Sequence, residues 1–422
     1  MHSSPRAEVI GAGIGGLTAA AALARCGWSV RLHERQSEIR AAGAGIYVWD
    51  NGLYALDAVG AFEEATQDAH IGPAVEARSR QGRTLYRIAI NGPDQPRCYT
   101  LLRDRLMRAL VAAARAAGVE IVTSSQATRA HADGRVEFEG APDARADLVV
   151  AADGVHSRLR DRLGLARRRT RMRQGAARLM VPASADYLPA ADAPLHLEHF
   201  QGRRRLLYTP CTADAVYLAL VSDASDPAVR GARIDAASWT RSFPTLGALI
   251  DQAAQVETRW DTFELIQLRS WSHGRVAFLG DCAHAQPPYL GQGGGTAMNN
   301  AVALAASVSR PGAGGTAREH VPASLAVWER EQRPGTERTQ RTSYRMRLLN
   351  QIPDAARDAL LTAVSRSPRV ARSQLAATRL RPATPLPLMN PPANPPAIPR
   401  ANLPADSDGD GYDRTKDKEQ ER

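Results

Sequence analysis

The apolar positions in the first third of the chain alternate between short continuous runs and longer segments with helical spacing. An apolar run at residues 8–12 leads into a glycine-rich turn at 11–16, and residues 17–25 favour a helix. A second apolar run at 29–32 ends just before the acidic Glu34. Strand, glycine turn, helix, strand and acid within about 30 residues predict a β-α-β unit of the type that binds a dinucleotide.

Each glycine of the turn is required there for a physical reason. Gly11 permits a tight turn, Gly13 lets the backbone approach a pyrophosphate, and Gly16 allows the helix to pack closely. The phosphate then faces the helix N-terminus with its free N–H groups. We expect Glu34 to accept hydrogen bonds from ribose hydroxyls, and a glycine turn that binds nothing is the alternative at this stage.

The pattern changes twice further along the chain. Residues 103–117 predict an amphipathic helix, and 148–151 predict a buried strand. Residues 171–270 instead carry two short helical stretches and several β-type runs, among them 177–181, 206–209 and 216–221. The earlier pattern resumes at 275–281. We therefore expect a mostly antiparallel second domain inserted in the first.

Length and composition fit two domains. The 422 residues exceed the roughly 250 at which a single core stops growing. Hydrophobic residues make up 44% of the chain, but no run reaches the roughly 20 apolar residues that a membrane helix needs. No apolar segment precedes the first strand, so no secretory signal is visible, and we expect a cytoplasmic protein without a membrane partner.

Cysteine usage and charge exclude two further classes of protein. The four cysteines lie far apart without histidines at ligand spacing, so they predict neither a zinc site nor a disulfide framework. The net charge of +10 comes almost entirely from arginine, since Lys416 and Lys418 are the only lysines. Because the arginines are spread along the chain, we expect no nucleic-acid partner.

The C-terminal part has a different composition. Residues 381–404 contain nine prolines, which cannot continue a helix or a central strand. Carboxylates at 406–412 and Asp417 have the spacing of a calcium loop, but the flanking helices are absent. A solvated acidic tail is the better interpretation, and we expect 381–422 to be disordered.

Three separated motifs point to one cofactor. They are the glycine turn, the segment LVVAADGVHSR at 148–158, and the segment GDCAH at 280–284 with its continuation to Gly295. In this order and at these separations, they resemble the single-component flavin-dependent aromatic hydroxylases, the p-hydroxybenzoate hydroxylase-like family, over roughly residues 6–345.

The resemblance implies an α/β fold, in which a Rossmann-like FAD-binding domain carries an inserted, mostly antiparallel β substrate domain. We expect a discontinuous FAD-binding domain, a substrate domain in two segments, and a C-terminal helical segment. The FAD-binding domain is expected to comprise residues 6–75, 97–170 and 271–345. The substrate domain is expected at 76–96 and 171–270, and the helical segment at 346–380.

The resemblance also implies the residues that bind FAD. In the family, the residue matching Asp281 bonds the ribitol chain, the motif with Asp153 serves FAD and the passing nicotinamide cofactor, and the arginine matching Arg103 reaches the diphosphate side. Arg40 occupies a similar flavin-proximal position. The remaining expected FAD contacts are Gly11, Gly13, Gly16, Glu34, Arg35, Gly291, Gly293, Gly294 and Gly295.

A glycine-rich loop at 287–296 opens a helix expected at 296–309. Its free N–H groups and the positive end of the helix would stabilise a reduced flavin, which is anionic at N1 and the C2 carbonyl. By family analogy, Pro288 in the same loop shapes the oxygen pocket.

Within the family, the sequence is similar to the 2-methyl-3-hydroxypyridine-5-carboxylate oxygenases. In these enzymes the positions matching Arg205 and Tyr217 face the substrate carboxylate and ring hydroxyl, and Tyr47 matches a pocket tyrosine. An arginine fork suits a carboxylate, and a phenol can hold a ring oxygen. Val75 and Phe263 stand where these relatives have tyrosines, which points to a different ring substrate.

The resemblance implies that NADH or NADPH reduces FAD and that O2 then forms a C4a-hydroperoxyflavin, which hydroxylates an electron-rich ring. The expected substrate is a hydroxylated aromatic or pyridine carboxylate. Whether the enzyme also opens the ring is not decided by the sequence. Two alternatives remain: a flavin enzyme of this fold that epoxidises or reduces an isoprenoid-like alkene, and a non-catalytic FAD-binding protein that interacts through its proline-rich tail.

Overall fold

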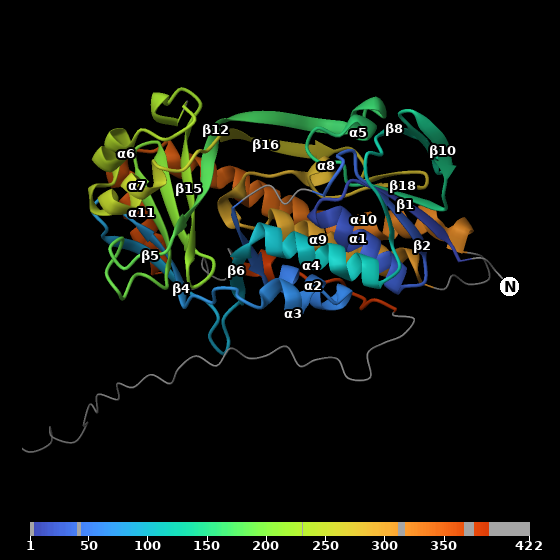
Figure 1. The fold of residues 1–422 in the computed structure, drawn as a ribbon, viewed down its shortest axis with the longest axis horizontal. Coiled ribbons are helices and arrows are strands. Elements are labelled where there is room, and N and C mark those ends of the chain that lie inside the picture. Colours follow the sequence, from blue (N-terminus) through green and yellow to red (C-terminus); the bar gives the residue numbers. More distant parts are fainter. Residues whose placement is uncertain (1–3, 40–43, 230, 311–316, 367–374, 388–422) are drawn as a thin grey trace, which may run out of the picture.

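The computed structural model describes residues 4–39, 44–229, 231–310, 317–366 and 375–387. A six-stranded sheet near one end of the molecule has the order β17-β18-β11-β1-β2-β7 (Figure 1). Its neighbouring strands are parallel except for β17 and β18. The strands are β1 (Arg6–Ile10), β2 (Ser29–His33), β7 (Glu120–Val122), β11 (Leu148–Ala151), β17 (Ser272–His273) and β18 (Val276–Phe278).

Helices rich in small residues pack beside this sheet. Helix α1 (Ile14–Arg25) lies against α4 (Arg103–Ala116) and α9 (Gly293–Val308), and α9 in turn contacts α10 (Ala317–Met346). Ten of the twelve residues of α1 are buried, many of them alanine, so its neighbours can approach closely. The sheet and these helices form the largest hydrophobic core of the described residues.

A seven-stranded sheet with the order β16-β12-β15-β14-β13-β4-β5 forms the other large layer (Figure 1). Only β13 and β4 are parallel, which confirms the expected mostly antiparallel second sheet. The strands are β4 (Ala74–Arg78), β5 (Thr84–Ala89), β12 (Ala166–Pro182), β13 (His196–Gln201), β14 (Arg204–Pro210), β15 (Ala215–Asp223) and β16 (Trp260–Leu268). The long strands β12 and β16 link the two parts of the molecule.

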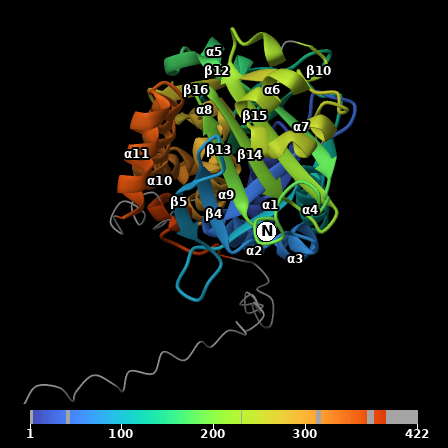
Figure 2. The same ribbon diagram turned by 90° about the vertical axis from the view of Figure 1, so that its left-hand side faces the viewer.

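The two faces of the seven-stranded sheet differ because strand side chains alternate. Leu197, Leu206 and Leu218 point to the outer face and form a second core with helices α6 (Ala236–Ser242) and α7 (Gly247–Ala253). Figure 2 shows these helices beside the sheet. We call the opposite side, which carries Tyr217, Leu207 and Glu198, the inner face.

Smaller elements complete the described chain. They are the sheet of β3 (Gly45–Trp49) and β6 (Cys98–Leu102), the sheet of β8 (Ala127–Ala130), β9 (Arg135–Phe138) and β10 (Ala141–Arg145), and the helices α2 (Asp50–Val59), α3 (Phe62–Thr66), α5 (Arg158–Arg162), α8 (Asp281–His284) and α11 (Asp354–Ser365).

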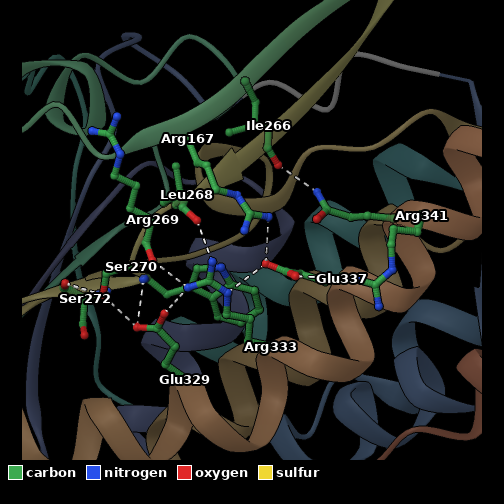
Figure 3. A network of polar contacts seen from close by, with 12 residues as sticks. Arg167, Ile266, Leu268, Arg269, Ser270, Ser272, Glu329, Arg333, Glu337 and Arg341 are labelled. Atoms are coloured by element: carbon green, nitrogen blue, oxygen red, sulfur yellow. Dashed lines mark hydrogen bonds and ion pairs between the residues drawn. The ribbon is translucent and has the colours of Figure 1, made fainter.

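One arginine attaches α10 to the end of β16. Arg333 donates hydrogen bonds to the carbonyl oxygens of Leu268 and Arg269, at 2.7 Å and 2.9 Å. Its Nε also donates to Glu337 at 2.8 Å, and Figure 3 shows Glu337 among Arg167, Arg333 and Arg341. Charge-assisted bonds of this kind fix the helix to the strand that joins the two sheets.

The start of the predicted tail contacts the folded body. The Arg381 guanidinium lies 5.2 Å from the centre of the Tyr54 ring, and Leu386 packs against the main core. The carboxylates at 406–412 and Asp417 lie outside the described residues.

Candidate active site

The glycine turn closes against the loop after β11. Gly11 has φ +104°, and a Cβ there would lie 2.5 Å from the Ala152 carbonyl oxygen. At Gly16 a Cβ would lie 1.9 Å from the Gly11 oxygen, so neither position tolerates a side chain. Gly13, which precedes the first turn of α1, instead faces open space, and no side chain caps that helix end. The turn thus leaves room for an anion beside free N–H groups.

Glu34 lies at the edge of this turn. Its carboxylate accepts hydrogen bonds from the backbone N–H groups of Ala12 and Gln36, both at 3.0 Å. These bonds hold the carboxylate beside the glycine turn, where the ribose diol is expected. Arg35 is exposed, and Arg40 lies outside the described residues.

A buried arginine that sequence reasoning missed connects the other two motifs. Arg160 is fully buried, and its Nη1 donates to the carbonyl oxygens of Val155 and Cys282, at 3.0 Å and 3.1 Å. Ser157 accepts a hydrogen bond from the Arg160 backbone N–H at 3.1 Å and caps α5. Arg160 lies just beyond the segment 148–158. The sequence feature that could have identified it is a charged residue three positions after the helix-capping Ser157.

Asp153 and Asp281 lie on the two loops that Arg160 connects. Burial raises the pKa of Asp153, and a hydrogen bond with Ser157 opposes this shift. Asp281 is exposed, yet desolvation by the surrounding protein raises its pKa, while the charges of Arg103 and Arg178 lower it. An exposed carboxyl that protein nevertheless desolvates lies in the wall of a recess.

Arg103 lies on the same recess, which we call the cofactor recess. Its side chain is exposed, while desolvation lowers its pKa and the charge of Asp281 raises it. Arg178 on β12 is half-buried and acts electrostatically on Asp281, Arg103 and Tyr217. The structure thus brings Arg103 and Asp281 together, and adds Arg178, which sequence reasoning did not select as a site residue.

The glycine-rich loop enters helix α9 earlier than expected. The helix begins at Gly293 rather than at residue 296, so Gly293, Gly294 and Gly295 form its first turn. A Cβ at Gly295 would lie 2.8 Å from Oδ1 of Asn51, and one at Gly294 would lie 3.1 Å from Ile46. The glycines therefore allow a helical turn where the neighbouring β3–α2 segment approaches closely.

The N-terminus of α9 has no side-chain cap, and Gly293 faces open space. Gly291, in a left-handed conformation, lies against Tyr47 and Trp49, and Pro288 is exposed on the same loop. The loop is thus closed toward the protein and open on the side of the helix end.

The residues of the glycine turn and the cofactor recess fit FAD. Open space beyond Gly13 and the uncapped end of α1 suit its diphosphate, and Glu34 suits its ribose. Asp281 and Arg103 offer an acceptor and a cation farther along the recess. The uncapped first turn of α9 suits the negative charge of a reduced flavin.

The inner face of the seven-stranded sheet carries polar side chains separated by apolar residues. Register places Arg178, Ala219, Leu207 and Glu198 side by side on successive strands, and Met180, Tyr217, Thr209 and His196 in the next row. Of these, Leu207, Glu198 and Arg178 are only half-buried although they lie on interior strands. This part of the inner face is therefore not fully covered, and we call it the substrate recess.

Tyr217 lies next to the cofactor recess. It is buried and hydrogen-bonds with Arg178. Burial raises the pKa of Tyr217, and the charges of Arg178 and Arg103 oppose this shift. A neutral phenol with a cationic neighbour can donate a hydrogen bond to a ring oxygen.

Tyr47 lies on the opposite wall. Its hydroxyl lies 2.6 Å from Oγ1 of Thr209, and its ring lies 5.3 Å from that of His196. Val75 is half-buried in the row of Thr209 and His196, and Phe263 is buried against Tyr289. Tyr47 thus already has a hydrogen-bond partner.

Arg205 is deeply buried and is paired with a carboxylate of the protein. Solvent reaches 1% of its side chain but 19% of that of Glu198, with which it forms an ion pair. The guanidinium lies between two rings, 5.0 Å from the centre of Phe200 and 5.3 Å from that of Tyr289. Glu198, which sequence reasoning missed, is therefore the ion-pair partner of Arg205, while Nε and Nη1 of the buried guanidinium have no hydrogen-bond partner among the described residues.

The described residues contain neither a metal-site arrangement nor a membrane-spanning helix. No group of three or more histidine, cysteine, aspartate and glutamate side chains there has the arrangement of a metal site. None of the described helices has the length and apolar character needed to cross a membrane.

Comparison with known families and structures agrees with this geometry. The family model described as an FAD binding domain matches residues 6–343. Among solved structures, that of 2-methyl-3-hydroxypyridine-5-carboxylic acid oxygenase has a TM-score of 0.79 and 36% identity, and the match covers 90% of this chain and 98% of that one. Klebsiella pneumoniae HpxO, crystallised with FAD and uric acid, has a TM-score of 0.74 and 25% identity over 89% and 96% of the chains.

Two curated relatives are more similar in sequence. A probable 2-heptyl-3-hydroxy-4(1H)-quinolone synthase of Rhodococcus erythropolis is 58% identical over 377 residues, which is 89% of this chain and 96% of the relative. A 2-heptyl-3-hydroxy-4(1H)-quinolone synthase of Mycobacteroides abscessus is 58% identical over 88% of this chain and 98% of its own length.

Proposed function

Because the chain belongs to the FAD-binding family of FAD-dependent aromatic monooxygenases, we propose that it hydroxylates a neutral 2-alkyl-4(1H)-quinolone at carbon 3. The flavin cofactor and the monooxygenase class follow from the family. The quinolone substrate, the site of hydroxylation and the nicotinamide reductant are the proposal.

The pairing of Arg205 with Glu198 carries the proposal. A substrate carboxylate needs a cation whose charge is not already balanced, but the guanidinium expected to hold it, that of Arg205, is buried between two rings and forms an ion pair with Glu198. Binding there would place two carboxylates on one guanidinium, at a desolvation cost. A neutral ring avoids this cost, and the names of the 58% identical relatives agree with such a substrate.

The chain's own residues would position the ring and exclude water. Bound FAD supplies the redox chemistry, taking electrons from NAD(P)H and activating O2. Tyr217, supported by Arg178, can donate a hydrogen bond to the oxygen at ring carbon 4. Ala219, which is buried, and Leu207, which is half-buried, lie between the polar groups, so a ring there would contact apolar side chains of the sheet.

The reaction balances as a monooxygenation. One atom of O2 enters the C3–OH bond, the other leaves as water, two electrons come from NAD(P)H, and carbon 3 loses its proton. Carbon 3 is nucleophilic because the ring nitrogen donates electron density to it, so no strong acid or base is required of the protein. Ring opening is not part of the proposal.

The test combines three measurements on the FAD-loaded protein with 2-heptyl-4(1H)-quinolone. We expect quinolone-stimulated NADH or NADPH consumption, equivalent O2 uptake, and a product that gains one oxygen-18 atom from labelled O2 at carbon 3. Stimulated consumption that yields only hydrogen peroxide, or a product with an opened ring, would contradict the proposal.

A hydroxylated pyridine or benzene carboxylate is the second candidate substrate. The 36% identical oxygenase structure and the presence of Arg205 and Tyr217 support it. Parallel assays with 2-methyl-3-hydroxypyridine-5-carboxylate distinguish the two, because this candidate requires faster turnover of the carboxylate than of the quinolone.

A further inference from the structure

The substrate recess presents a carboxylate, not a guanidinium, at the position farther from the cofactor recess. Glu198 lies in the same row as Arg178, with Ala219 and Leu207 on the two strands between them. Three strand spacings separate the two charged residues, about 14 Å. A flat ring that lies over Ala219 and Leu207 therefore has Arg178 at one edge and Glu198 at the other.

The surroundings of Glu198 fix its charge and its direction. Arg205 forms an ion pair with it, and Glu198 is the more exposed of the two partners, at 19% against 1% of the side chain. Burial and then the nearby Glu198 charge raise the pKa of Tyr86, and Glu198 also contributes to the raised pKa of buried Tyr47. Two phenols and one guanidinium thus lie near the Glu198 carboxyl group.

An ionised carboxylate with spare lone pairs needs hydrogen-bond donors. Arg205 approaches one oxygen, Oε1, as an ion pair, and the second oxygen has capacity to accept. A buried acceptor discriminates strongly, because a ligand without a donor leaves it unpaired. A ligand carboxylate at this place would meet a like charge instead.

We propose that Glu198, with its charge balanced by Arg205, accepts a hydrogen bond from the ring N–H of a neutral heteroaromatic substrate and excludes aromatic carboxylates. This inference rests on the proposed function for the identity of the ring, but it concerns a binding contact that can be measured without turnover. Arg205 is a positioning residue for Glu198 in this account.

The test measures binding to the oxidised FAD-loaded protein by the change in flavin absorbance. The probes are 2-heptyl-4(1H)-quinolone, its N-methyl analogue, and 2-methyl-3-hydroxypyridine-5-carboxylate. For the unmodified protein we expect the N–H quinolone to bind about tenfold or more tightly than the N-methyl analogue, and the carboxylate to bind weakest.

The decisive variant is Glu198→Gln. It should weaken the N–H quinolone about tenfold and reduce the preference over the N-methyl analogue, because an amide oxygen is a weaker acceptor than a carboxylate. It should also strengthen carboxylate binding, because the charge of Arg205 is then no longer balanced. Glu76→Gln is the matched control. Like Glu198, Glu76 is a carboxylate paired with an arginine, Arg78, on the same sheet, but it is buried and register places it on the outer face with Leu197.

A second variant covers the case in which Glu198→Gln does not fold. The double variant Glu198→Leu/Arg205→Met removes both charges and replaces them by apolar groups, a change that buried ion pairs often tolerate. It should lose the N–H preference without gaining carboxylate affinity.

Two results would overturn the inference. One is an unchanged N–H preference in Glu198→Gln or in the double variant, and the other is a carboxylate that binds the unmodified protein as tightly as the quinolone does. Glu198-dependent binding without a hydroxylated product would instead contradict the proposed function and leave this contact supported.

Discussion

The cofactor recess and the substrate recess are built in different ways. The first is formed by loops in which neighbouring residues act together: Gly11, Gly13 and Gly16 lie within one turn, and Arg160 ties two further loops to each other. The second is formed by single side chains on several strands, such as Arg178, Leu207 and Glu198. Backbone shape therefore dominates one site, and side-chain pairing dominates the other.

This difference teaches where sensitivity to substitution should lie. In the cofactor recess a single methyl group can prevent the loops from closing, because the close contacts are with backbone atoms. In the substrate recess we expect a substitution to change which ligand binds, because Arg205 and Glu198 form an ion pair and replacing one leaves the charge of the other unbalanced. The predictions below test this contrast.

The largest expected effect is that of Gly16→Ala. The new Cβ would lie 1.9 Å from the Gly11 carbonyl oxygen, which is backbone and cannot yield cheaply. We expect insoluble protein or protein without flavin, with a loss of stability above about 4 kcal/mol. Soluble yield and the flavin-to-protein absorbance ratio measure it.

Gly13→Ala is the matched control in the same turn. Gly13 has φ −78°, which alanine adopts, and its Cβ would meet no atom within 4 Å. We expect an unchanged unfolding temperature in the FAD-free protein but weaker FAD binding, because the methyl group occupies the space left for the diphosphate. Equal FAD affinity in Gly13→Ala would contradict our assignment of that space.

Asp281→Ala should have the next largest effect. Loss of this acceptor removes a charge-assisted hydrogen bond to the cofactor, and leaves Arg103 and Arg178 without its charge. We expect FAD affinity to fall by about 2 to 3 kcal/mol, so that purified protein is nearly colourless. Asp261→Ala, at a half-buried carboxylate on β16, provides the control, and full flavin content in Asp281→Ala would refute the role of Asp281.

Acid sensitivity should be a smaller effect and should be greater in the substrate sheet. Burial lowers the pKa of His196 to about 3 and those of His199 and His284 to about 4. An unfolded histidine takes up its proton near pH 6.5, so this contribution to stability is complete above that pH. It is lost as pH falls toward 4, by about 1.4 kcal/mol per pH unit for each histidine.

Thermal unfolding at pH 7.5 and pH 5.5 measures this loss. Two of the three histidines lie on β13, so His199→Gln should reduce the difference between the two unfolding temperatures. The same difference in the variant and in the unmodified protein would contradict the assignment.

Much of the cofactor site could be predicted from sequence, because it consists of short contiguous motifs whose glycines are needed for backbone reasons. The glycine turn, Glu34 and Asp281 lie where the motifs indicated. Helix α9 began earlier than expected because Asn51 and Ile46, distant in sequence, determine where its glycines can pack. Arg160 was missed because the partners that connect the two motifs are carbonyl oxygens, of Val155 and Cys282, which leave no sequence pattern.

The substrate site could be predicted only in part. The antiparallel sheet was expected, but the partners of Arg205 depend on register between β13 and β14. Glu198 carries no motif, and only the folded sheet shows that it covers Arg205. A sequence therefore indicates that an arginine faces a pocket more readily than it shows whether that arginine is already paired.

A crystal structure of the FAD complex with 2-heptyl-4(1H)-quinolone tests the central claim most directly. We expect the flavin in the cofactor recess beside Asp281 and Arg103, and the quinolone ring over Ala219 and Leu207 with its N–H on Glu198. A quinolone bound outside the inner face, or one with its N–H turned away from Glu198, would contradict the account.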